Sequence, residues 1–171
     1  MNKRGFTLVE LLVTVGLTLI IGTVGTNIIA SILRSYNKAQ IINEIEQNGN
    51  YVLSLMESQI RNAGSVVCDG GGTDCLKVNV APQEGNAFSF EITGASGIGE
   101  LRKDNEVLTN NDLRTGVDVV ISGTSESHFR VEGTKVTIIL KLTQAPNAPG
   151  RIDYQAETTL QTTVVVRGGY E

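Results

Sequence analysis

The sequence contains no tryptophan, one histidine, three prolines and two cysteines in 171 residues. Histidine is the side chain that most readily exchanges a proton near neutral pH, so its scarcity argues against an ordinary hydrolase. The 14 Lys and Arg residues are outnumbered by 18 Asp and Glu, which gives a net charge of −4. A protein whose main role is to neutralise nucleic-acid phosphates needs the opposite balance. The length predicts one folded domain.

An uncharged run of 23 residues, from Leu11 to Leu33, dominates the N-terminal part of the chain. About 20 predominantly apolar residues are enough to cross a bilayer as a helix. Glycines and threonines make the run less hydrophobic than a dedicated membrane anchor. Small residues of this kind suit close packing between helices. Lys3 and Arg4 precede it, so the positive-inside rule places the N-terminus in the cytoplasm. The run lacks the short apolar core and small-residue cleavage site of a conventional secretory signal.

The apolar run continues into an amphipathic helix. Apolar residues recur at steps of three and four, which places them on one helical face, and proline is absent between Phe6 and Ala63. The pattern therefore predicts one continuous helix over these residues, with Gly49 as a weak point because glycine disfavours a helix interior. The stripe comprises Ile29, Ile32, Leu33, Tyr36, Ala39, Ile42, Ile45, Val52, Met56, Ile60 and Ala63.

After Ala63 the pattern changes to the alternation that is typical of half-buried strands. It predicts strands over residues 88–92, 117–121 and 135–142 and a last strand from about Tyr154 to Arg167, with weaker candidates around Val78, Leu101, Val107 and Phe129. We expect an α+β fold, in which the second half of the long helix packs on an antiparallel sheet formed by residues 64–171. Covering the sheet with the amphipathic stripe would give both elements a core.

The residues at the start of the chain carry a specific signal, Lys3-Arg4-Gly5-Phe6-Thr7-Leu8-Val9-Glu10-Leu11-Leu12. This segment closely resembles the class III signal of type IV pilins and type II secretion pseudopilins. The resemblance implies that a membrane-embedded prepilin peptidase cuts between Gly5 and Phe6 and methylates the new amine of Phe6. It also implies that Glu10, the fifth residue of the mature chain, meets the N-terminal amine of a neighbouring subunit during assembly. A carboxylate among apolar residues is costly without such a partner, although a signal-anchor helix with Glu10 at the membrane interface is the alternative.

The resemblance divides the chain into a leader (1–5), a transmembrane and assembly helix (6–33), its amphipathic continuation (34–63) and a sheet domain (64–171). Many major pilins have a proline near the middle of the apolar helix, whereas here residues 22–27 read Gly-Thr-Val-Gly-Thr-Asn. The rest of the chain is diffusely similar to PilW-like minor pilins and J-type pseudopilins, at residues 58–64, 135–142 and 164–167. These similarities favour a minor, initiating or tip-located subunit over a bulk subunit.

Cys68 and Cys75 enclose a glycine-rich loop. If the sheet domain is exported, disulfides can persist there, and a flexible loop can bring the two thiols together, so a local disulfide is the favoured interpretation. Two free thiols are the first alternative. The second is a calcium site built from Asp69 and Asp74, because some pseudopilins bind calcium and this cation prefers oxygen ligands, although two carboxylates are too few.

The remaining candidate residues favour structural roles. His128 has no adjacent Cys, Asp or Ser arrangement that would make a nucleophile, so we interpret it as a strand or turn residue. Arg130, Lys135, Lys141 and Arg151 are interpreted as a solvated face, with DNA contact as the alternative. The sequence predicts no catalytic residue, no cofactor and no metal site, and nucleic acid is an improbable partner.

Two classes of function follow. The first is a non-enzymatic subunit of a type IV pilus or type II secretion pseudopilus, whose partners are other pilin or pseudopilin subunits, the prepilin peptidase and the membrane. It would cross the inner membrane once, with a cytoplasmic N-terminus, and then join a filament outside the cytoplasm. The second is a membrane-anchored extracytoplasmic binding or adhesion module that is exported by the pilin route.

Overall fold

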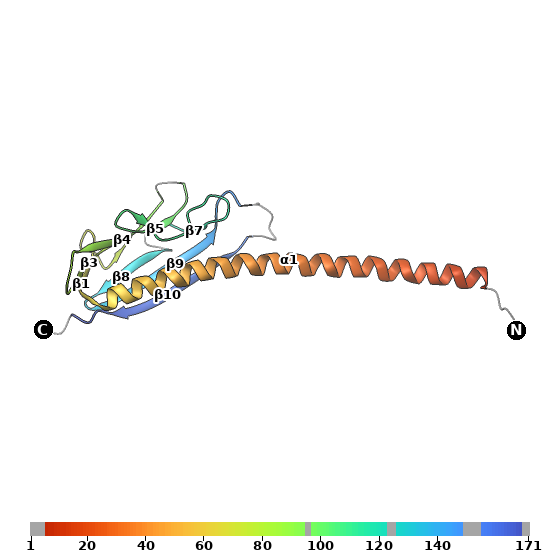
Figure 1. The fold of residues 1–171 in the computed structure, drawn as a ribbon, viewed down its shortest axis with the longest axis horizontal. Helices are drawn as coiled ribbons and strands as arrows, with labels where there is room; N and C mark the ends of the chain where they lie inside the picture. The colour runs from red at the N-terminus through yellow and green to blue at the C-terminus, as the bar shows by residue number, and fades with distance from the viewer. Residues whose placement is uncertain (1–5, 95–96, 123–125, 149–154, 169–171) are drawn as a thin grey trace. The chain divides into compact units, whose positions relative to one another are not determined.

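The computed structural model describes residues 6–94, 97–122, 126–148 and 155–168. The chain divides into two compact units, a helical unit of residues Met1–Asn37 and a globular unit of residues Lys38–Glu171. The described residues form one helix and ten strands, and Figure 1 labels most of them. Their bounds are α1 Leu8–Arg61, β1 Ala63–Cys68, β2 Asp74–Cys75, β3 Lys77–Pro82, β4 Phe88–Thr93, β5 Glu100–Lys103, β6 Glu106–Val107, β7 Val117–Val119, β8 His128–Glu132, β9 Lys135–Gln144 and β10 Glu157–Val165.

Helix α1 is continuous over 54 residues, as the absence of proline predicts. It is slightly shorter than the predicted range of Phe6 to Ala63. Its last turn closes where the Asn62 side chain donates a hydrogen bond to the Ser58 carbonyl at 3.0 Å. The assignment of Ala63 to the helix was wrong, because this residue is the first of β1 and pairs with Pro82 of β3.

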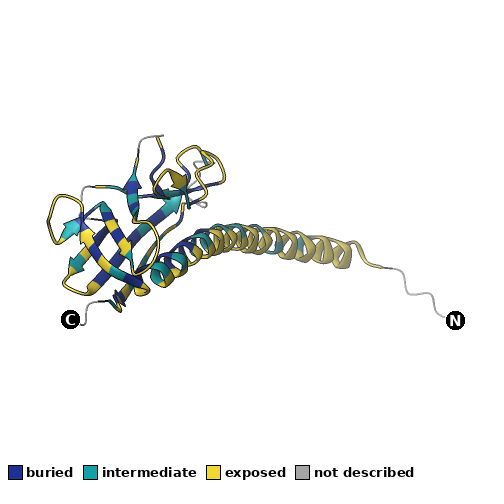
Figure 2. Cartoon of the chain, turned by 60° about the vertical axis from the view of Figure 1, so that its left-hand side comes forward, coloured by how far each residue is buried: buried dark blue, intermediate teal, exposed yellow. Residues whose placement is uncertain are grey.

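In the helical unit, the apolar side chains of α1 lie on the surface. Figure 2 colours almost all of this part of the helix as exposed. An 18-residue window of α1 has a mean hydropathy of 2.1 and no buried residue, so by length and composition this helix could cross a membrane. The exposed large apolar residues of this unit include Leu8, Val9, Leu11, Leu12, Leu17, Ile20, Ile21, Ile28, Ile29, Ile32 and Leu33.

In the globular unit, one face of α1 is buried. The buried positions follow steps of three and four, as an amphipathic helix requires. At the centre of this face Gly49 allows close approach, because a Cβ atom there would lie 2.5 Å from Leu142 Cδ1 and would also overlap Leu160 Cδ1. Helix α1 therefore packs against β9 and β10, which Figure 1 shows beside it. The buried residues of α1 are Ile45, Gly49, Val52, Leu53, Met56 and Ile60.

The strands form two antiparallel sheets, although a single sheet was predicted. The first has the order β1-β3-β4-β5-β6, and the second has the order β10-β9-β8-β2, with β7 paired to β9. The sheets meet where β1 lies near β8 and β5 lies near β7. Alternation within a strand shows which residues face the core but not which strands become neighbours, so local patterns could not separate the two sheets.

The long strands agree with their predicted faces. In β9, Val136, Ile138, Leu140 and Leu142 are fully buried, as predicted. Thr137 was expected to face away but is also buried, since its hydroxyl lies 3.1 Å from that of Thr163 on β10. The last strand is Glu157–Val165, shorter than the predicted range, and Tyr154 lies outside the described residues.

Candidate processing and assembly site

The start of α1 is a capping motif. The Glu10 backbone N–H donates to the Thr7 hydroxyl at 3.3 Å, and the Leu11 N–H donates to the Thr7 carbonyl at 3.2 Å. Thr7 is thus the N-cap, and Glu10 lies three residues later, the spacing of a capping box. An acid in the first turn also interacts favourably with the helix dipole. This local role of Thr7 and Glu10 was missed, although the Thr-x-x-Glu spacing is visible in the sequence.

The residues predicted to take part in processing lie next to this cap. Phe6 precedes Thr7 and its side chain is 77% exposed. Gly5, Lys3 and Arg4 lie outside the described residues. Glu10 is exposed as well, in the first turn of α1. The geometry therefore leaves both Phe6 and Glu10 accessible to another molecule.

The hydroxyl groups of the apolar helix are satisfied within the helix itself. Each of four threonines donates to a carbonyl three or four residues earlier, at distances between 2.7 and 3.1 Å. An unsatisfied hydroxyl would be costly in hydrocarbon, whereas these back-bonded groups present mainly their methyls. This part of α1 is therefore compatible with lipid or with a second apolar helix. The four residues are Thr14, Thr18, Thr23 and Thr26.

In the globular unit, a disulfide joins Cys68 at the end of β1 to Cys75 in β2. Their Cα atoms are 5.8 Å apart, and both residues are buried. Gly70 and Gly71 adopt φ values of 85° and 77°, which few other residues adopt without strain, and they turn the chain between the cysteines. The bond therefore links β1, an outer strand of the first sheet, to β2, an outer strand of the second sheet.

Asp74, beside this disulfide, forms a bidentate ion pair with Arg130 of β8. Arg130 Nε donates to Asp74 Oδ1 at 2.7 Å and Nη2 donates to Oδ2 at 3.2 Å. The hydrogen bonds from Arg130 are the main reason that the pKa of the Asp74 carboxyl lies below its ordinary value, and the pKa of Arg130 is raised in turn. This pair was not predicted, because it joins residues 56 positions apart.

The same ion pair bears on the calcium interpretation. Asp74 is engaged by Arg130, and Asp69 accepts a hydrogen bond from the Asn79 side chain at 3.4 Å. The two carboxylates are therefore not directed at a shared cation. Over the described ranges, no three His, Cys, Asp or Glu residues are grouped so that they could hold a metal ion.

Two residues of the predicted basic face, Arg130 and Lys141, are paired with acids, whereas Lys135 is exposed. Besides the Arg130 pair, Lys141 Nζ lies 3.0 Å from Glu126 Oε1 and 3.8 Å from Glu157 Oε2. The contact with Glu126 raises the pKa of Lys141 above its ordinary value. Arg151 lies outside the described residues. Cations that are paired in this way offer little to a phosphate backbone.

His128 is a buried residue of β8. Its Nδ1 lies 3.3 Å from the Glu126 carbonyl, and its Nε2 lies 4.0 Å from Asp74 Oδ1. Within the described part of the chain, no serine or cysteine nucleophile is hydrogen-bonded to its ring. His128 thus has the structural position that the sequence predicts.

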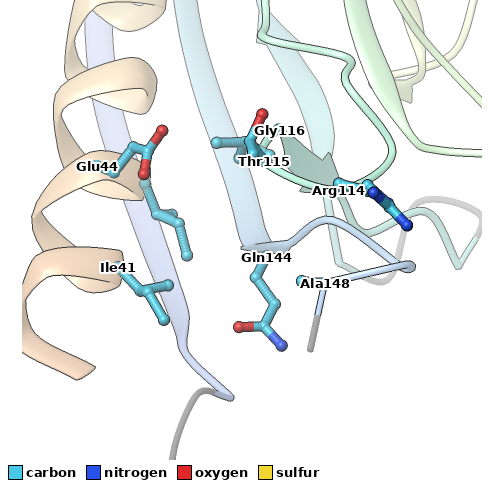
Figure 3. Close-up of a pocket in the computed structure, with 9 residues that line it drawn as sticks. Ile41, Glu44, Arg114, Thr115, Gly116, Gln144 and Ala148 are labelled. Carbon is cyan, nitrogen blue, oxygen red and sulfur yellow. The ribbon is translucent and has the colours of Figure 1, made fainter. Parts of the chain in front are cut away.

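A small cavity of about 220 Å³ lies in the globular unit between α1, β7 and the end of β9. Figure 3 shows the Gln144 amide in this cavity, between Ile41 and Ala148. The Gln144 Oε1 atom is buried and accepts no hydrogen bond from the described protein atoms. The lining is mainly apolar, and among the described residues Glu44 is its only carboxylate. Its residues are Ile41, Glu44, Ile45, Arg114, Thr115, Gly116, Val117, Gln144 and Ala148.

Comparison with known proteins agrees with the N-terminal signal. Residues 1–26 match the family model described as the prokaryotic N-terminal methylation motif. No curated protein and no solved structure matches the chain. The matched segment contains the Gly5–Phe6 bond, Glu10 and most of the uncharged run that forms the exposed helix. Proteins with this motif have structural rather than enzymatic roles. The motif, together with a long apolar helix followed by antiparallel sheets, supports the type IV pilin and pseudopilin family for this chain.

Proposed function

We propose that this protein is a minor, initiating subunit of a type IV pilus or a type II secretion pseudopilus and assembles through its N-terminal helix. The prepilin peptidase cuts it between Gly5 and Phe6 and methylates the Phe6 amine. The chain first crosses the inner membrane once, with its N-terminus in the cytoplasm. It then leaves the bilayer and joins the filament outside the cytoplasm.

The observation that carries this proposal is the exposed apolar surface of α1 in the helical unit. Leu8 is 77% exposed and Ile21 is 70% exposed. Exposure of such a continuous apolar surface to water is unfavourable. Burying each methylene group away from water stabilises the protein by about 0.8 kcal/mol. Lipid covers this surface before assembly, and the apolar helices of neighbouring subunits cover it afterwards. The methylation motif over residues 1–26 supports the same sequence of events.

The minor role rests on weaker sequence features. The apolar helix has glycines and threonines where many major pilins have a proline. The chain also shares diffuse similarity with PilW-like minor pilins and J-type pseudopilins. Both features favour a subunit that starts or caps a filament over one that forms its bulk.

The test is mass spectrometry of sheared, washed filaments, with the abundance of this chain measured relative to the major subunit. We expect a mature N-terminus at methylated Phe6 and an abundance of at most a few per cent. An abundance equal to that of the major subunit would contradict the minor role. A processed chain that stays in the membrane and never enters filaments would favour the anchored binding or adhesion module instead.

A further inference from the structure

Strand β10 is a long, regular strand at the edge of the second sheet. It pairs with β9 through nine consecutive residue pairs, from Glu157 opposite Thr143 to Val165 opposite Lys135, without a bulge. Its other side has no neighbouring strand within the described residues. Among the described residues, the backbone groups on that side thus have no partner strand, and such groups can pair with a further strand.

The hydrogen bonds around β9 show which backbone groups of β10 point away from the sheet. The Val166 N–H donates to the Thr134 carbonyl at 2.8 Å, so this residue pair is hydrogen-bonded. Such pairs alternate along an antiparallel ladder. In agreement, the Lys141 N–H bonds to the Ser127 hydroxyl and its carbonyl accepts from the Val120 N–H, both away from β10. The outward N–H and C=O groups of β10 therefore belong to residues 157, 159, 161, 163 and 165.

This edge lacks the features that usually prevent strand addition. Edge strands are commonly kept short, bulged, or marked with proline or lysine. Strands β2 and β6 have two residues each, and the pairing of β1 is irregular between Ala63 and Ser65. By contrast, β10 has nine residues, with four threonines and two valines, no proline and no lysine. These β-branched residues suit a paired strand.

We propose that the free edge of β10 binds an extended edge strand of a different subunit in the same filament. The added strand continues the second sheet across the subunit boundary, and its main-chain hydrogen bonds supply the attraction. This inference rests on the proposed function, because it requires that the chain enters a filament.

Charge defines the partner strand. Glu157, at the start of β10, lies 3.8 Å from Lys141 Nζ, but its side chain is still 69% exposed, which leaves room for a second cation. The rest of the strand is uncharged. The complementary strand is neutral and β-branched over most of its length, with Lys or Arg opposite Glu157. A second copy of β10 does not fit this description. It has no cation of its own, and the nearest, Arg167, lies in the turn after the strand.

Hydrogen exchange of the full mature chain tests the proposal directly. Amide exchange is compared between the protein in detergent micelles and the protein in native filaments. We expect the amides of Thr159, Gln161 and Thr163 to exchange at least about tenfold more slowly in filaments, whereas the inward amides of Leu160 and Thr162 are protected in both states. If the chain is in filaments and the outward amides remain fast, the proposal is wrong.

Two substitutions of Gln161 distinguish the contribution of its backbone N–H from the contribution of its side chain. Gln161→Pro removes an outward N–H that β9 does not use, and proline is tolerated on the solvent side of an edge strand. Gln161→Thr keeps the N–H and is the matched control. We expect the proline variant to enter filaments about tenfold less than the threonine variant. Equal incorporation of the two variants would overturn the proposal.

Other outcomes identify which conclusion fails. Absence of the wild-type chain from filaments would defeat the proposed function. Protection of β10 in detergent together with a dimer in solution would show that a second copy occupies the edge, which contradicts a different subunit as the partner. In a Lys141→Gln background, which removes repulsion from this chain's own Lys141, Glu157→Lys should reduce incorporation further than Glu157→Gln, because it repels the partner's cation. The reverse order would contradict the assigned charge of the partner strand.

Discussion

Gly49 of α1 lies against Leu160 of β10, at the point where the helix packs on the second sheet. A Cβ atom at position 49 would overlap the Leu160 side chain and lie 2.5 Å from Leu142 Cδ1. The sequence alone predicts that Gly49 weakens the helix. In the structure, Gly49 is buried and lies in contact with the sheet. The close approach of helix and sheet therefore depends on the missing side chain.

We predict that Gly49→Ala destabilises the globular unit despite the better helix propensity of alanine. Alanine gains up to about 1 kcal/mol in a helix interior, but inserting atoms into a packed core costs about 1 to 3 kcal/mol. The net loss should be about 1 kcal/mol and larger for Gly49→Val. Thermal unfolding of the purified chain in detergent, followed by circular dichroism, measures both variants.

The matched control for this prediction is the double variant Gly49→Ala with Leu160→Ala. Truncating Leu160 removes one of the two overlaps, while that with Leu142 remains, so Gly49→Ala should be less harmful in this background but not neutral. A Gly49→Ala substitution that raises the Tm equally in both backgrounds would show that packing against Leu160 does not constrain position 49.

The helix and the long strands could be predicted because their evidence is local. Proline-free amphipathic periodicity predicted α1 to within two residues at each end, and alternation predicted the buried face of β9. By contrast, β1 was missed because it begins two residues after the helix ends, where Ala63 continues the helical stripe. The pairing of Asp74–Cys75 with Phe129–Arg130 joins distant parts of the chain, so local periodicity does not indicate it.

The features of the candidate site likewise fall into those that the sequence indicates and those that only the structure shows. The residues proposed for cleavage and assembly, Gly5, Phe6 and Glu10, lie within one short motif, so the sequence alone indicates them. The Asp74–Arg130 pair and the free edge of β10 depend on the tertiary fold, so they emerge only from the structure.

The Cys68–Cys75 disulfide should stabilise the globular unit without affecting processing. The bond joins residues seven positions apart, for which loop-closure entropy gives at most about 2.5 kcal/mol. The double variant Cys68→Ser, Cys75→Ser should lose this amount in chemical unfolding, while cleavage and membrane insertion continue. Reduction of the wild type should reproduce the loss, and equal stability of the oxidised and reduced forms would contradict it.

The Asp74–Arg130 pair predicts an acid-dependent part of the stability. Because the pKa of folded Asp74 lies below its ordinary value, the pair stabilises the fold fully above the unfolded pKa of about 4 and loses this effect as pH falls through the lowered folded pKa. Asp74→Asn should lower the Tm slightly at neutral pH and converge with the wild type near about pH 2. Asp69→Asn is the neighbouring control. A constant Tm difference across this range would contradict the prediction.

Gly5→Leu should block maturation. Glycine offers no side chain at the bond to be cut, and leucine places a branched group there. We expect intact-mass analysis to show the uncleaved chain in the membrane, whereas Asn2→Leu, which changes the leader away from the bond, is processed normally. Efficient cleavage of Gly5→Leu, or a mature wild-type N-terminus other than Phe6, would show that the site is elsewhere.

Glu10 should be required for filament assembly but not for insertion or cleavage. A carboxylate can stay near the interface while the helix is in the membrane, but it needs a partner once the helix enters a dry filament core. The methylated amine of Phe6 on a neighbouring subunit is a cation that every processed chain carries. Pairing would fix the axial stagger between helices, because an unpaired buried charge costs several kcal/mol in wrong registers.

Three substitutions separate this role from the helix-capping role of Glu10. Glu10→Gln keeps a hydrogen-bonding side chain at the capping-box position, whereas Glu10→Ala and Glu10→Leu lose both the charge and that side chain. The bond from the backbone N–H of residue 10 to the Thr7 hydroxyl is available to all three variants. All three should be cleaved after Gly5, and incorporation into sheared filaments, measured by quantitative mass spectrometry, should fall from wild type to Gln and then to Ala and Leu. The cap contributes about 1 kcal/mol or less, which is too little to prevent a 54-residue helix from forming. Wild-type incorporation of Glu10→Leu would therefore rule out the ion pair and favour a signal-anchor helix whose Glu10 serves only the first turn.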